Sequence, residues 1–303
     1  IGVVLHRDKL EQQLADNARK LGATILLGTE VTGLHQNRRG ERGGVIMEDG
    51  NAIEGRFIVG ADGCESKVGQ WAGITGPLRL DEVASTVEYH VESNYCNDGF
   101  LHFFMGSSVV GPGYLWIFPK GENHVLVGGG IYGCPRDIPK VKHYVDQFIA
   151  RRMPQARRHS MITGCVPVTL CPRELTRHNV LVIGDAARQS NPLSAGGIMN
   201  ALEAADLAAD AVLACNGDER KLRVYSRRWA QNQRRQQKLY RLLRDIVVNS
   251  SDSQITALAR TVSHLFKGEL DRSKPFKLPI ARLFILCMGV LPKAFRYRRA
   301  LVG

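Results

Sequence analysis

The chain has 303 residues, of which 44% are hydrophobic and 23% charged, as is typical of a globular protein with a sizeable core. This composition excludes fibrous and intrinsically disordered proteins. Seven cysteines, none in a CxxC pair, argue against a disulfide framework and against a Cys-only zinc or iron–sulfur site, and they fit a reducing cytoplasm.

The net charge of +12 is unevenly distributed along the chain. Residues 1–216 carry 21 Lys and Arg against 23 Asp and Glu, whereas residues 217–303 carry 20 against 6. The positive excess therefore belongs to the last segment. It predicts an anionic partner there, either a membrane surface or a nucleic acid.

The first part of the chain has the pattern of an α/β unit. Apolar residues recur at helical spacing over 7–21, which predicts a helix that Gly22 terminates. The segment 23–28, ATILLG, predicts a short apolar strand. Asp49-Gly50 predicts a hairpin turn, and 56–63, RFIVGADG, a buried strand that ends in a glycine-containing turn.

The pattern changes after residue 75. Residues 76–176 contain several strand-like segments separated by Gly, Pro and Asn, with one helix at about 139–153, which predicts an antiparallel sheet inserted into an α/β frame. The run NVLVIG, 179–184, predicts a central parallel strand, and an Ala-rich helix at 197–214 follows it. From Glu219 onward the pattern is that of helices dense in Arg and Lys.

Asp185 follows the strand 179–184, at the edge where α/β sheets bind ligands. Gly196, Gly197 and Ile198 then open a helix with little side-chain bulk, so their backbone N–H groups can approach an electron-rich ring or an anion. An aspartate that accepts from a polyol, followed by such a helix start, suits a flavin. The simpler alternative is an aspartate that caps a turn.

A second acidic corner, Asp62-Gly63, ends the earlier buried strand and is followed by Ser66 and Val68. Alone it is compatible with a simple turn. Together, the ADGxxSxV and GD…P…GG motifs resemble those of flavoproteins built on the para-hydroxybenzoate hydroxylase fold. In that group the GD aspartate holds the ribityl chain of FAD, and the DG segment lies near the flavin and the nicotinamide route.

The resemblance implies an FAD-binding Rossmann-like domain of the glutathione reductase 2 type, an inserted antiparallel β-sheet substrate domain and a C-terminal helical region. The FAD-binding domain would comprise residues 1–75 and 177–215, without its N-terminal part. The substrate domain would comprise 76–176, and the basic helical region 216–303. Arg7 matches an arginine near the pyrophosphate and ribityl, and Val31 a position whose main chain meets the adenine. The full set of implied cofactor-binding residues is Arg7, Val31, Asp62, Gly63, Gly184, Asp185, Gly196, Gly197 and Ile198.

A further motif narrows the resemblance. The segment 113–130, GYLWIFPKGENHVLVGGG, fits YxWxFP, eight residues, then GxG, and resembles the geranylgeranyl reductase family, in which it helps to line the lipid cavity. Tyr114, Trp116 and Phe118 alternate along one strand and so face one side of the sheet. With Pro119 they are the substrate-binding residues that the resemblance implies. The simpler alternative is an aromatic core strand.

The chain departs from the family in two ways. The family opens with a GxGxxG βαβ unit and an acidic residue for ribose, which this sequence lacks, and we expect the natural protein to have further residues before Ile1. The match at 128–133, GGGIYG, is already explained by the YxWxFP…GxG motif. Gly69 stands where many relatives carry Arg, a position tied to nicotinamide docking. We expect no metal site, and the sequence identifies no catalytic residue or proton donor.

The basic segment leaves several interpretations open. Ten Lys and Arg between Arg220 and Arg244 alternate with Tyr225, Trp229 and Tyr240, which is compatible with a nucleic-acid surface or a solvated helix face, but no base-reading module is visible and we expect no nucleic acid. The apolar run 283–291 is too short to span a bilayer and is flanked by basic residues. It predicts peripheral contact with an anionic membrane.

The resemblance implies an FAD-dependent oxidoreductase that reduces carbon–carbon double bonds of a geranylgeranyl or polyprenyl chain, on a lipid or a prenylated cofactor, with electrons from NADPH or ferredoxin. One alternative is an FAD-dependent aromatic or polyprenyl-phenol hydroxylase or a halogenase. Another is a non-catalytic derivative of a flavoprotein that binds a membrane or a nucleic acid. The sequence predicts a cytoplasmic protein and gives no oligomeric state.

Overall fold

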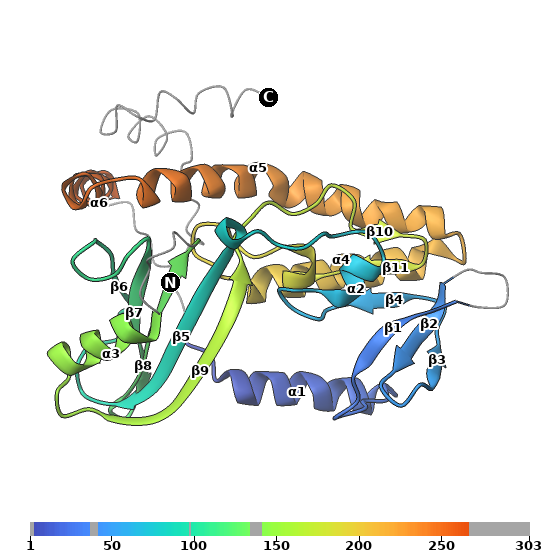
Figure 1. The fold of residues 1–303 in the computed structure, drawn as a ribbon, viewed down its shortest axis with the longest axis horizontal. Helices are drawn as coiled ribbons and strands as arrows, with labels where there is room; N and C mark the ends of the chain where they lie inside the picture. Colours follow the sequence, from blue (N-terminus) through green and yellow to red (C-terminus); the bar gives the residue numbers. More distant parts are fainter. Residues whose placement is uncertain (1–2, 37–41, 97, 134–140, 267–303) are drawn as a thin grey trace.

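The computed structural model describes residues 3–36, 42–96, 98–133 and 141–266. A five-stranded sheet with its helix occupies one end of the molecule, and a small three-stranded sheet the other (Figure 1). The long helix α5 (Arg223–Val248) runs along one side of the molecule, with α1 (Arg7–Lys20) on the opposite side. The apolar run 283–291 lies outside the described residues.

Helix α1 confirms the first predicted helix and its end. Gly22 has φ +93° and donates its N–H to the carbonyl of Arg19 at 2.9 Å, a conformation that glycine adopts at little cost. The apolar stripe of α1 is nevertheless uncovered, because Leu14 is 47% and Leu21 89% exposed and no residue of the helix is buried. The apolar periodicity therefore predicted the helix correctly, but no described element packs over its apolar stripe to bury it.

The strand predicted at 23–28 is wrong. These residues form no strand, and Leu26 and Leu27 are exposed. A strand requires a neighbour that accepts and donates its ladder hydrogen bonds, and no described segment pairs with this run. An apolar run alone therefore did not determine strand formation here.

The predicted hairpin at Asp49-Gly50 is confirmed. It joins β2 (Arg42–Met47) to β3 (Ala52–Glu54) in an antiparallel sheet that β1 (Val31–Gln36) completes. Gly50 has φ +81°, and the Asp49 carboxylate accepts from the backbone N–H of Asn51 at 2.9 Å. Both are features of the predicted turn chemistry.

The two acidic corners lie side by side because two distant strands pair. Strand β11 (Val180–Val182) runs parallel to β4 (Ile58–Gly60), with Val182 opposite Gly60, and β10 (Thr176–Arg177) completes this sheet. Both buried strands predicted here are confirmed. Helix α4 (Ile198–Cys215), which confirms the predicted Ala-rich helix, packs its alanines against β11.

The inserted segment forms the predicted antiparallel sheet, in the order β6-β7-β8-β5-β9. One face of the sheet packs on α3 (Val141–Arg152), which confirms the helix predicted at about 139–153. The opposite face carries the aromatic and polar side chains of the candidate site. The strands are β5 (Val83–Glu92), β6 (His102–Phe104), β7 (Gly113–Gly121), β8 (His124–Tyr132) and β9 (Arg157–Pro167).

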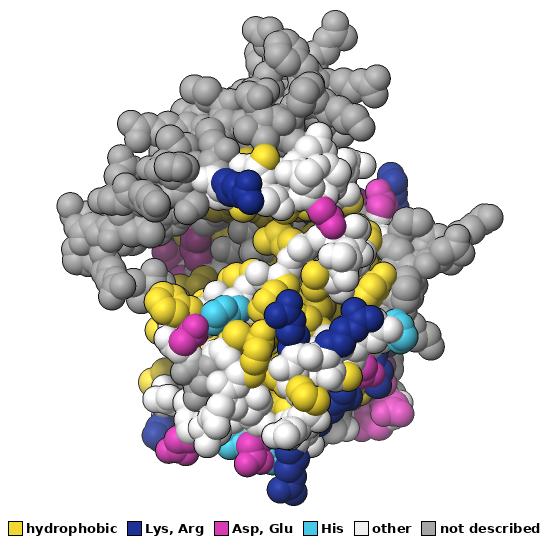
Figure 2. Space-filling model, turned by 90° about the vertical axis from the view of Figure 1, so that its left-hand side faces the viewer, with side chains coloured by type: hydrophobic (Ala, Val, Ile, Leu, Met, Phe, Trp, Pro, Cys, Tyr) yellow, Lys and Arg dark blue, Asp and Glu magenta, His cyan; other side chains and the backbone are white. Residues whose placement is uncertain are grey.

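The remaining helices of the described residues are α2 (Lys67–Trp71), α6 (Asp252–Phe266) and the 3-10 turns η1 (Leu80–Glu82), η2 (Gly184–Ala187) and η3 (Glu219–Leu222). In the described part of the chain, no helix is both long and apolar enough to cross a bilayer. Figure 2 shows the end of the molecule with α3, where hydrophobic side chains gather among Lys, Arg and His. Around β6, Phe100, Phe103 and Met105 are about half exposed or more.

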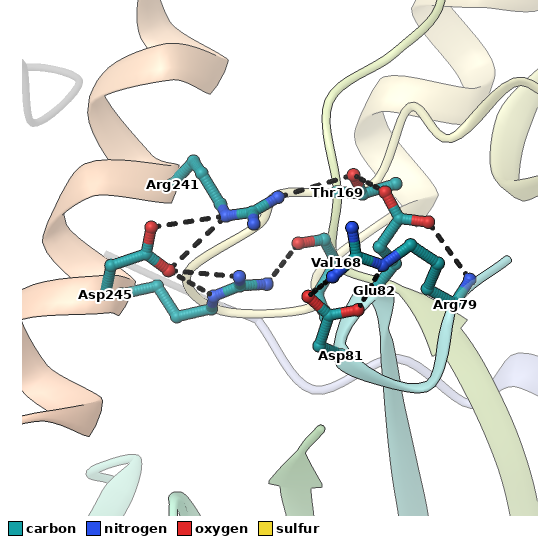
Figure 3. A network of polar contacts seen from close by, with 8 residues as sticks. Arg79, Asp81, Glu82, Val168, Thr169, Arg241 and Asp245 are labelled. Carbon is teal, nitrogen blue, oxygen red and sulfur yellow. Dashed lines mark hydrogen bonds and ion pairs between the residues drawn. The ribbon is translucent and has the colours of Figure 1, made fainter. Parts of the chain in front are cut away.

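Helix α5 is fastened to the sheet by a polar network (Figure 3). Arg244, 5% exposed, donates to the carbonyl of Val168, and both Arg241 and Arg244 pair with Asp245 at 3.3 and 3.0 Å. Thr169 links Arg241 to Glu82, the last residue of η1 before β5. Some of the basic residues that the sequence offers to an anionic partner are therefore internal contacts of the fold.

The aromatic residues of the basic segment also belong to the core. Tyr225 and Trp229 are 0% and 2% exposed and pack with α4 and β11. An interleaved aromatic on a nucleic-acid surface must stack on bases, which buried rings cannot do. The geometry of α5 therefore favours a helix whose aromatic face is structural and whose remaining face is solvated.

A buried polar chain predicts the effect of one substitution. The Tyr225 hydroxyl donates to the carbonyl of Val182 at 3.0 Å and accepts from the Gln189 amide at 2.9 Å. Tyr225→Phe leaves both groups buried without their partner, so we expect a loss of about 1–3 kcal/mol in the free energy of unfolding, measured by denaturant titration. Tyr240→Phe, in a half-buried residue of the same helix, is expected to change it by less than about 0.5 kcal/mol. Equal values for the two variants would contradict the role given to this chain.

Candidate functional site

The Asp185 carboxylate stands beside the start of α4. It is partly buried in η2, and among the described residues no group hydrogen-bonds to it. Burial raises the pKa of this carboxyl, while the charge of Arg7 opposes the rise. A Cβ on Gly197 would lie 3.2 Å from Asp185 Oδ1, so a side chain there would crowd the carboxylate. An acceptor left unused by the protein, next to a bare helix start, fits a polyol chain and the ring of a flavin.

The corner that carries Asp185 is held rigidly by Gln189, which is fully buried. Its side-chain oxygen accepts from the Gly184 N–H at 2.7 Å, and its amide donates to Tyr225. Gly184 has φ +62°, a left-handed conformation that favours glycine. Gly184 thus shapes the turn, and Gln189 fixes it to α5.

The loop before α4 is tied to the five-stranded sheet by two tyrosines. Tyr114 donates its hydroxyl to the carbonyl of Ser194 at 2.5 Å, and Tyr132 donates to the carbonyl of Leu193. Burial raises the pKa of Tyr114 to about 12, so its hydroxyl keeps its proton at neutral pH and remains a donor. The hydroxyl of Tyr114 therefore binds the loop before α4, whereas its ring lies on the exposed face of the sheet.

At the other corner, the Asp62 side chain is already used by the protein. Its two oxygens accept from the Ser66 hydroxyl and the Val68 N–H, each at 2.8 Å, which caps α2. Gly63 has φ +79° and open space where a side chain would stand. The carboxylate of Asp62 therefore acts as the sequence alternative of a simple turn predicts, whereas partly buried Gly63 has open space beside its backbone.

Gly69 is a packing requirement in α2. A Cβ at this position would lie 2.3 Å from the Thr75 hydroxyl oxygen and 2.8 Å from that of Ser66. The arginine that the family resemblance leads one to expect at this position would therefore require a local rearrangement of these side chains.

One cavity brings two of the predicted cofactor residues together with one of the predicted substrate residues. We call it the sheet cavity: it has a volume of about 670 Å³ and lies between the N-terminal segment, the start of α4 and the exposed face of the five-stranded sheet. Arg7 and Ile198 line it from the cofactor side and Phe118 from the sheet. The other lining residues are Val3, Val4, Leu5, His6, Asp8, Glu88, His90, Leu101, Lys120, Gly121, Glu122, His124, Leu126, Ser160 and Ile162.

Not every predicted site residue lies around this cavity. Arg7 is 60% exposed, with an ion pair to Glu11 at 2.7 Å, so its guanidinium is at the rim. Val31 begins β1 opposite Met47, and most of the predicted site residues do not line the sheet cavity. Those outside its lining are Val31, Asp62, Gly63, Gly184, Asp185, Gly196, Gly197, Tyr114, Trp116 and Pro119. Of the site residues predicted from the sequence, only Arg7, Phe118 and Ile198 therefore line the sheet cavity together.

The aromatic side chains of β7 form a continuous wall on one face of the sheet. The ring centroids of Tyr114 and Trp116 are 5.6 Å apart, and those of Trp116 and Phe118 are 6.0 Å apart. Phe103 of β6 extends the row, 5.7 Å from Tyr114 and 5.5 Å from Phe118. Pro119 lies next in the strand and pairs with Val125. The expected alternation along β7 is therefore present.

The glycines of the same motif explain how Trp116 is placed. Trp116 lies opposite Gly128 in the neighbouring strand, and a Cβ on Gly128 would meet the indole ring at 2.4 Å. The ring therefore lies flat across β8 and reaches β5, where its N–H donates to Glu88 at 2.8 Å. On the opposite face, a Cβ on Gly129 would collide with Leu115 at 2.4 Å.

Glu88 is the site residue that the sequence did not identify. It lines the sheet cavity, and burial raises its pKa, while the Trp116 hydrogen bond and the charges of Arg7 and Lys120 oppose the rise. The available signal was a charged residue on β5 between buried Val87 and Tyr89, with its side chain on the opposite face of the sheet from theirs. That alternation is equally typical of a solvated sheet face, so only the three-dimensional pairing singles it out.

Among the described residues, no group of three or more His, Cys, Asp and Glu side chains is placed to hold a metal ion. Residues 3–112 match the family described as FAD binding domain, and residues 82–167 match the family described as geranylgeranyl reductase catalytic domain.

Solved structures agree on the fold. The chain is similar to a geranylgeranyl bacteriochlorophyll reductase-like protein from Thermoplasma acidophilum, with a TM-score of 0.83, 24% identity and coverage of 99% of this chain and 76% of that one. It also resembles a flavin-dependent brominase, with a TM-score of 0.67, 15% identity and coverage of 98% and 75%. The fold and the two family matches together define an FAD-dependent oxidoreductase.

Relatives in sequence specify the family. A digeranylgeranylglycerophospholipid reductase of Methanosarcina acetivorans is 32% identical over 299 residues, which cover 96% of this chain and 71% of the relative. The enzyme of the same name from Methanosarcina mazei is 32% identical over 271 residues, which cover 86% of this chain and 67% of the relative. The chain belongs to the geranylgeranyl reductase family.

The packing of Trp116 on Gly128 predicts a sharp sensitivity at one position. Gly128→Ala places a methyl group inside the indole ring, so we expect it to lower the free energy of unfolding by about 1–3 kcal/mol and to shift the tryptophan fluorescence. Gly164→Ala is the matched control, because the added Cβ would lie at an ordinary 3.7 Å from the Thr86 hydroxyl oxygen. If both variants unfold at the same denaturant concentration as the wild type, the contact does not have this role.

Proposed function

We propose that this enzyme reduces carbon–carbon double bonds in the geranylgeranyl chain of a membrane lipid. The observation that carries the proposal is the sheet cavity, because one hollow joins Arg7 and Ile198, on the cofactor side, to Phe118 and Leu126 on the apolar sheet face. A volume of about 670 Å³ is in the range of small-molecule sites. The relatives' names indicate the substrate class.

FAD, when bound and reduced, supplies a hydride, which is two electrons with one hydrogen. In this proposal the Asp185 carboxylate accepts hydrogen bonds from the ribityl hydroxyls, and Gly184 shapes the corner that presents it. Arg7 neutralises the pyrophosphate at the rim. The backbone N–H groups of Gly197 and Ile198 stabilise negative charge on the ring, supported by the dipole of α4.

The remaining predicted cofactor positions act through the main chain. Val31 would contact the adenine by its backbone, and the open backbone at Gly63 would face the ring edge, with Asp62 holding that turn through its cap on α2. Gly196, next to Gly197, keeps the helix start narrow. The assignment of 1–75 with 177–215 to the cofactor domain is part of the same proposal.

The aromatic wall positions the prenyl chain. Tyr114, Trp116 and Phe118 present adjacent ring faces, and apolar rings exclude water from the reacting double bond. Pro119 would limit the end of this wall. A long, flexible apolar chain needs such a surface, because it offers few polar groups by which a protein could orient it.

The electron donor is NADPH or ferredoxin. The lack of room at Gly69 for the arginine of many relatives favours ferredoxin or an NADPH route that does not use this position. Anaerobic flavin reduction by NADPH, compared with reduced ferredoxin at equal concentration, separates the two donors.

Removal of the proposed ribityl acceptor tests the cofactor site. Asp185→Ala is expected to weaken FAD binding at least about tenfold, because a hydrogen bond to a charged group contributes about 1.5–3 kcal/mol. The measurement is titration of FAD with the protein, followed by quenching of flavin fluorescence. Asp206→Ala, in an exposed residue of α4, is the control and should bind FAD as the wild type does. Equal affinity of the two variants would refute the role of Asp185.

We further propose peripheral contact with an anionic membrane through the basic C-terminal region. Residues 217–303 carry 20 Lys and Arg against 6 Asp and Glu, and the substrate is itself a lipid in this proposal. Near an anionic surface each basic residue contributes about 1 kcal/mol.

Vesicle sedimentation tests this contact. The chain should bind vesicles of anionic phospholipid more strongly than zwitterionic ones, and added salt should weaken the binding. Replacing the four basic residues after the apolar run by Gln should reduce binding at least about tenfold, whereas replacing two exposed arginines of α3 should not. The positions are Lys293, Arg296, Arg298 and Arg299, and for the control Arg151 and Arg152. Binding that depends on neither lipid charge nor these residues would contradict the proposal.

A further inference from the structure

Glu88 lies where the apolar sheet face meets the cofactor side of the sheet cavity. Its strand, β5, lies inside the sheet between β8 and β9, and the cavity is also lined by Arg7, Phe118 and Ile198. The reaction proposed for this site requires one proton for each double bond, and a prenyl chain carries no acidic group to supply it. A carboxyl group inside the cavity is a suitable source.

We propose that Glu88 is the general acid of the reaction, and that it delivers the proton to the alkene carbon that does not receive the hydride. This inference rests on the proposed function. In the step, the π bond breaks, one carbon gains a hydrogen with both electrons from the reduced flavin, and the other gains the proton of Glu88. The flavin is left oxidised, Glu88 is left as a carboxylate, and a solvent proton restores the acid.

The surroundings of Glu88 suit both of its charge states. Burial raises the pKa of the carboxyl, which favours the protonated acid before the step. After the step, the indole N–H of Trp116, 2.8 Å away, and the charges of Arg7 and Lys120 stabilise the carboxylate. An acid that is neutral at rest and stabilised once ionised is what proton transfer to carbon requires.

In this proposal, the YxWxFP…GxG motif places Trp116 so that its indole N–H contacts the acid Glu88. Trp116 reaches Glu88 only because Gly128 has no side chain between them. The tryptophan thereby presents its ring to the apolar chain and its N–H to the acid. The same contact keeps the carboxyl group from turning away from the sheet face.

The charged and titratable groups around Glu88 come from every element packed against it. They are His6 before α1, Arg7 and Asp8 of α1, His90 of β5, Lys120 of β7, Glu122 between β7 and β8, His124 of β8 and His159 of β9. Because several charged groups surround Glu88, its pH profile must be compared between variants.

The test uses the FAD-loaded protein, reduced anaerobically with dithionite and mixed with a geranylgeranyl lipid. Glu88→Gln retains an acceptor for the Trp116 N–H but has no acidic proton, so alkene-driven flavin reoxidation should slow at least about 100-fold while lipid binding is retained. The wild-type rate should fall as pH rises through the pKa of Glu88, because only the protonated form acts, and this limb should vanish in the variant. Glu92→Gln, four residues on in β5 and paired with His159, is the control and should react like the wild type.

A second readout requires no cofactor. In the FAD-free chain, the fluorescence of Trp116 should change as Glu88 titrates, and this change should be absent in Glu88→Gln and in Trp116→Phe. A wild-type reoxidation rate in Glu88→Gln, or the same fluorescence titration in that variant, would overturn the assignment of Glu88. If the wild type itself is not reoxidised by the lipid, the proposed function fails instead, so the two failures are distinguishable.

Discussion

The parallel pairing of β4 with β11 is the constraint on which the site depends. The two strands are separated by more than a hundred residues of chain, and their register, Val182 opposite Gly60, places both acidic corners at one edge of a sheet. The inserted five-stranded sheet leaves and returns between these strands, so its exposed face is brought to the corner of Asp185. A loss of this pairing would separate the cofactor side of the sheet cavity from its apolar side.

The YxWxFP…GxG motif describes one packing arrangement in two neighbouring strands. The aromatic positions supply a wall, and the glycines remove the bulk that would push the wall off the sheet. The polar consequence is the contact of Trp116 with Glu88, two strands away. The spacing of the motif therefore reflects the register between β7 and β8, in which Trp116 stands opposite Gly128.

Local signals in the sequence predicted most of the elements, and long-range pairing explains what they missed. The helices at α1, α3 and α4, the hairpin at Asp49-Gly50 and both buried strands follow from periodicity and turn chemistry. The segment 23–28 has the same apolar character but no pairing partner. The use of the Asp62 carboxylate as a helix cap depends on the path of the next turn, and Glu88 becomes notable only when the ring of Trp116 crosses to it. Such facts need coordinates, because no local pattern encodes them.

Tyr114 contacts both the aromatic wall of the sheet and the segment that leads into α4. Its ring belongs to the apolar wall, while its hydroxyl holds the carbonyl of Ser194 in the segment that leads into α4. Tyr132 holds the adjacent carbonyl of Leu193 in the same segment. Under the proposed function, a lipid that orders this wall would also order the turn proposed to face the flavin, and thermodynamic reciprocity would require the converse. The hydroxyls of Tyr114 and Tyr132 would then couple lipid binding to cofactor binding.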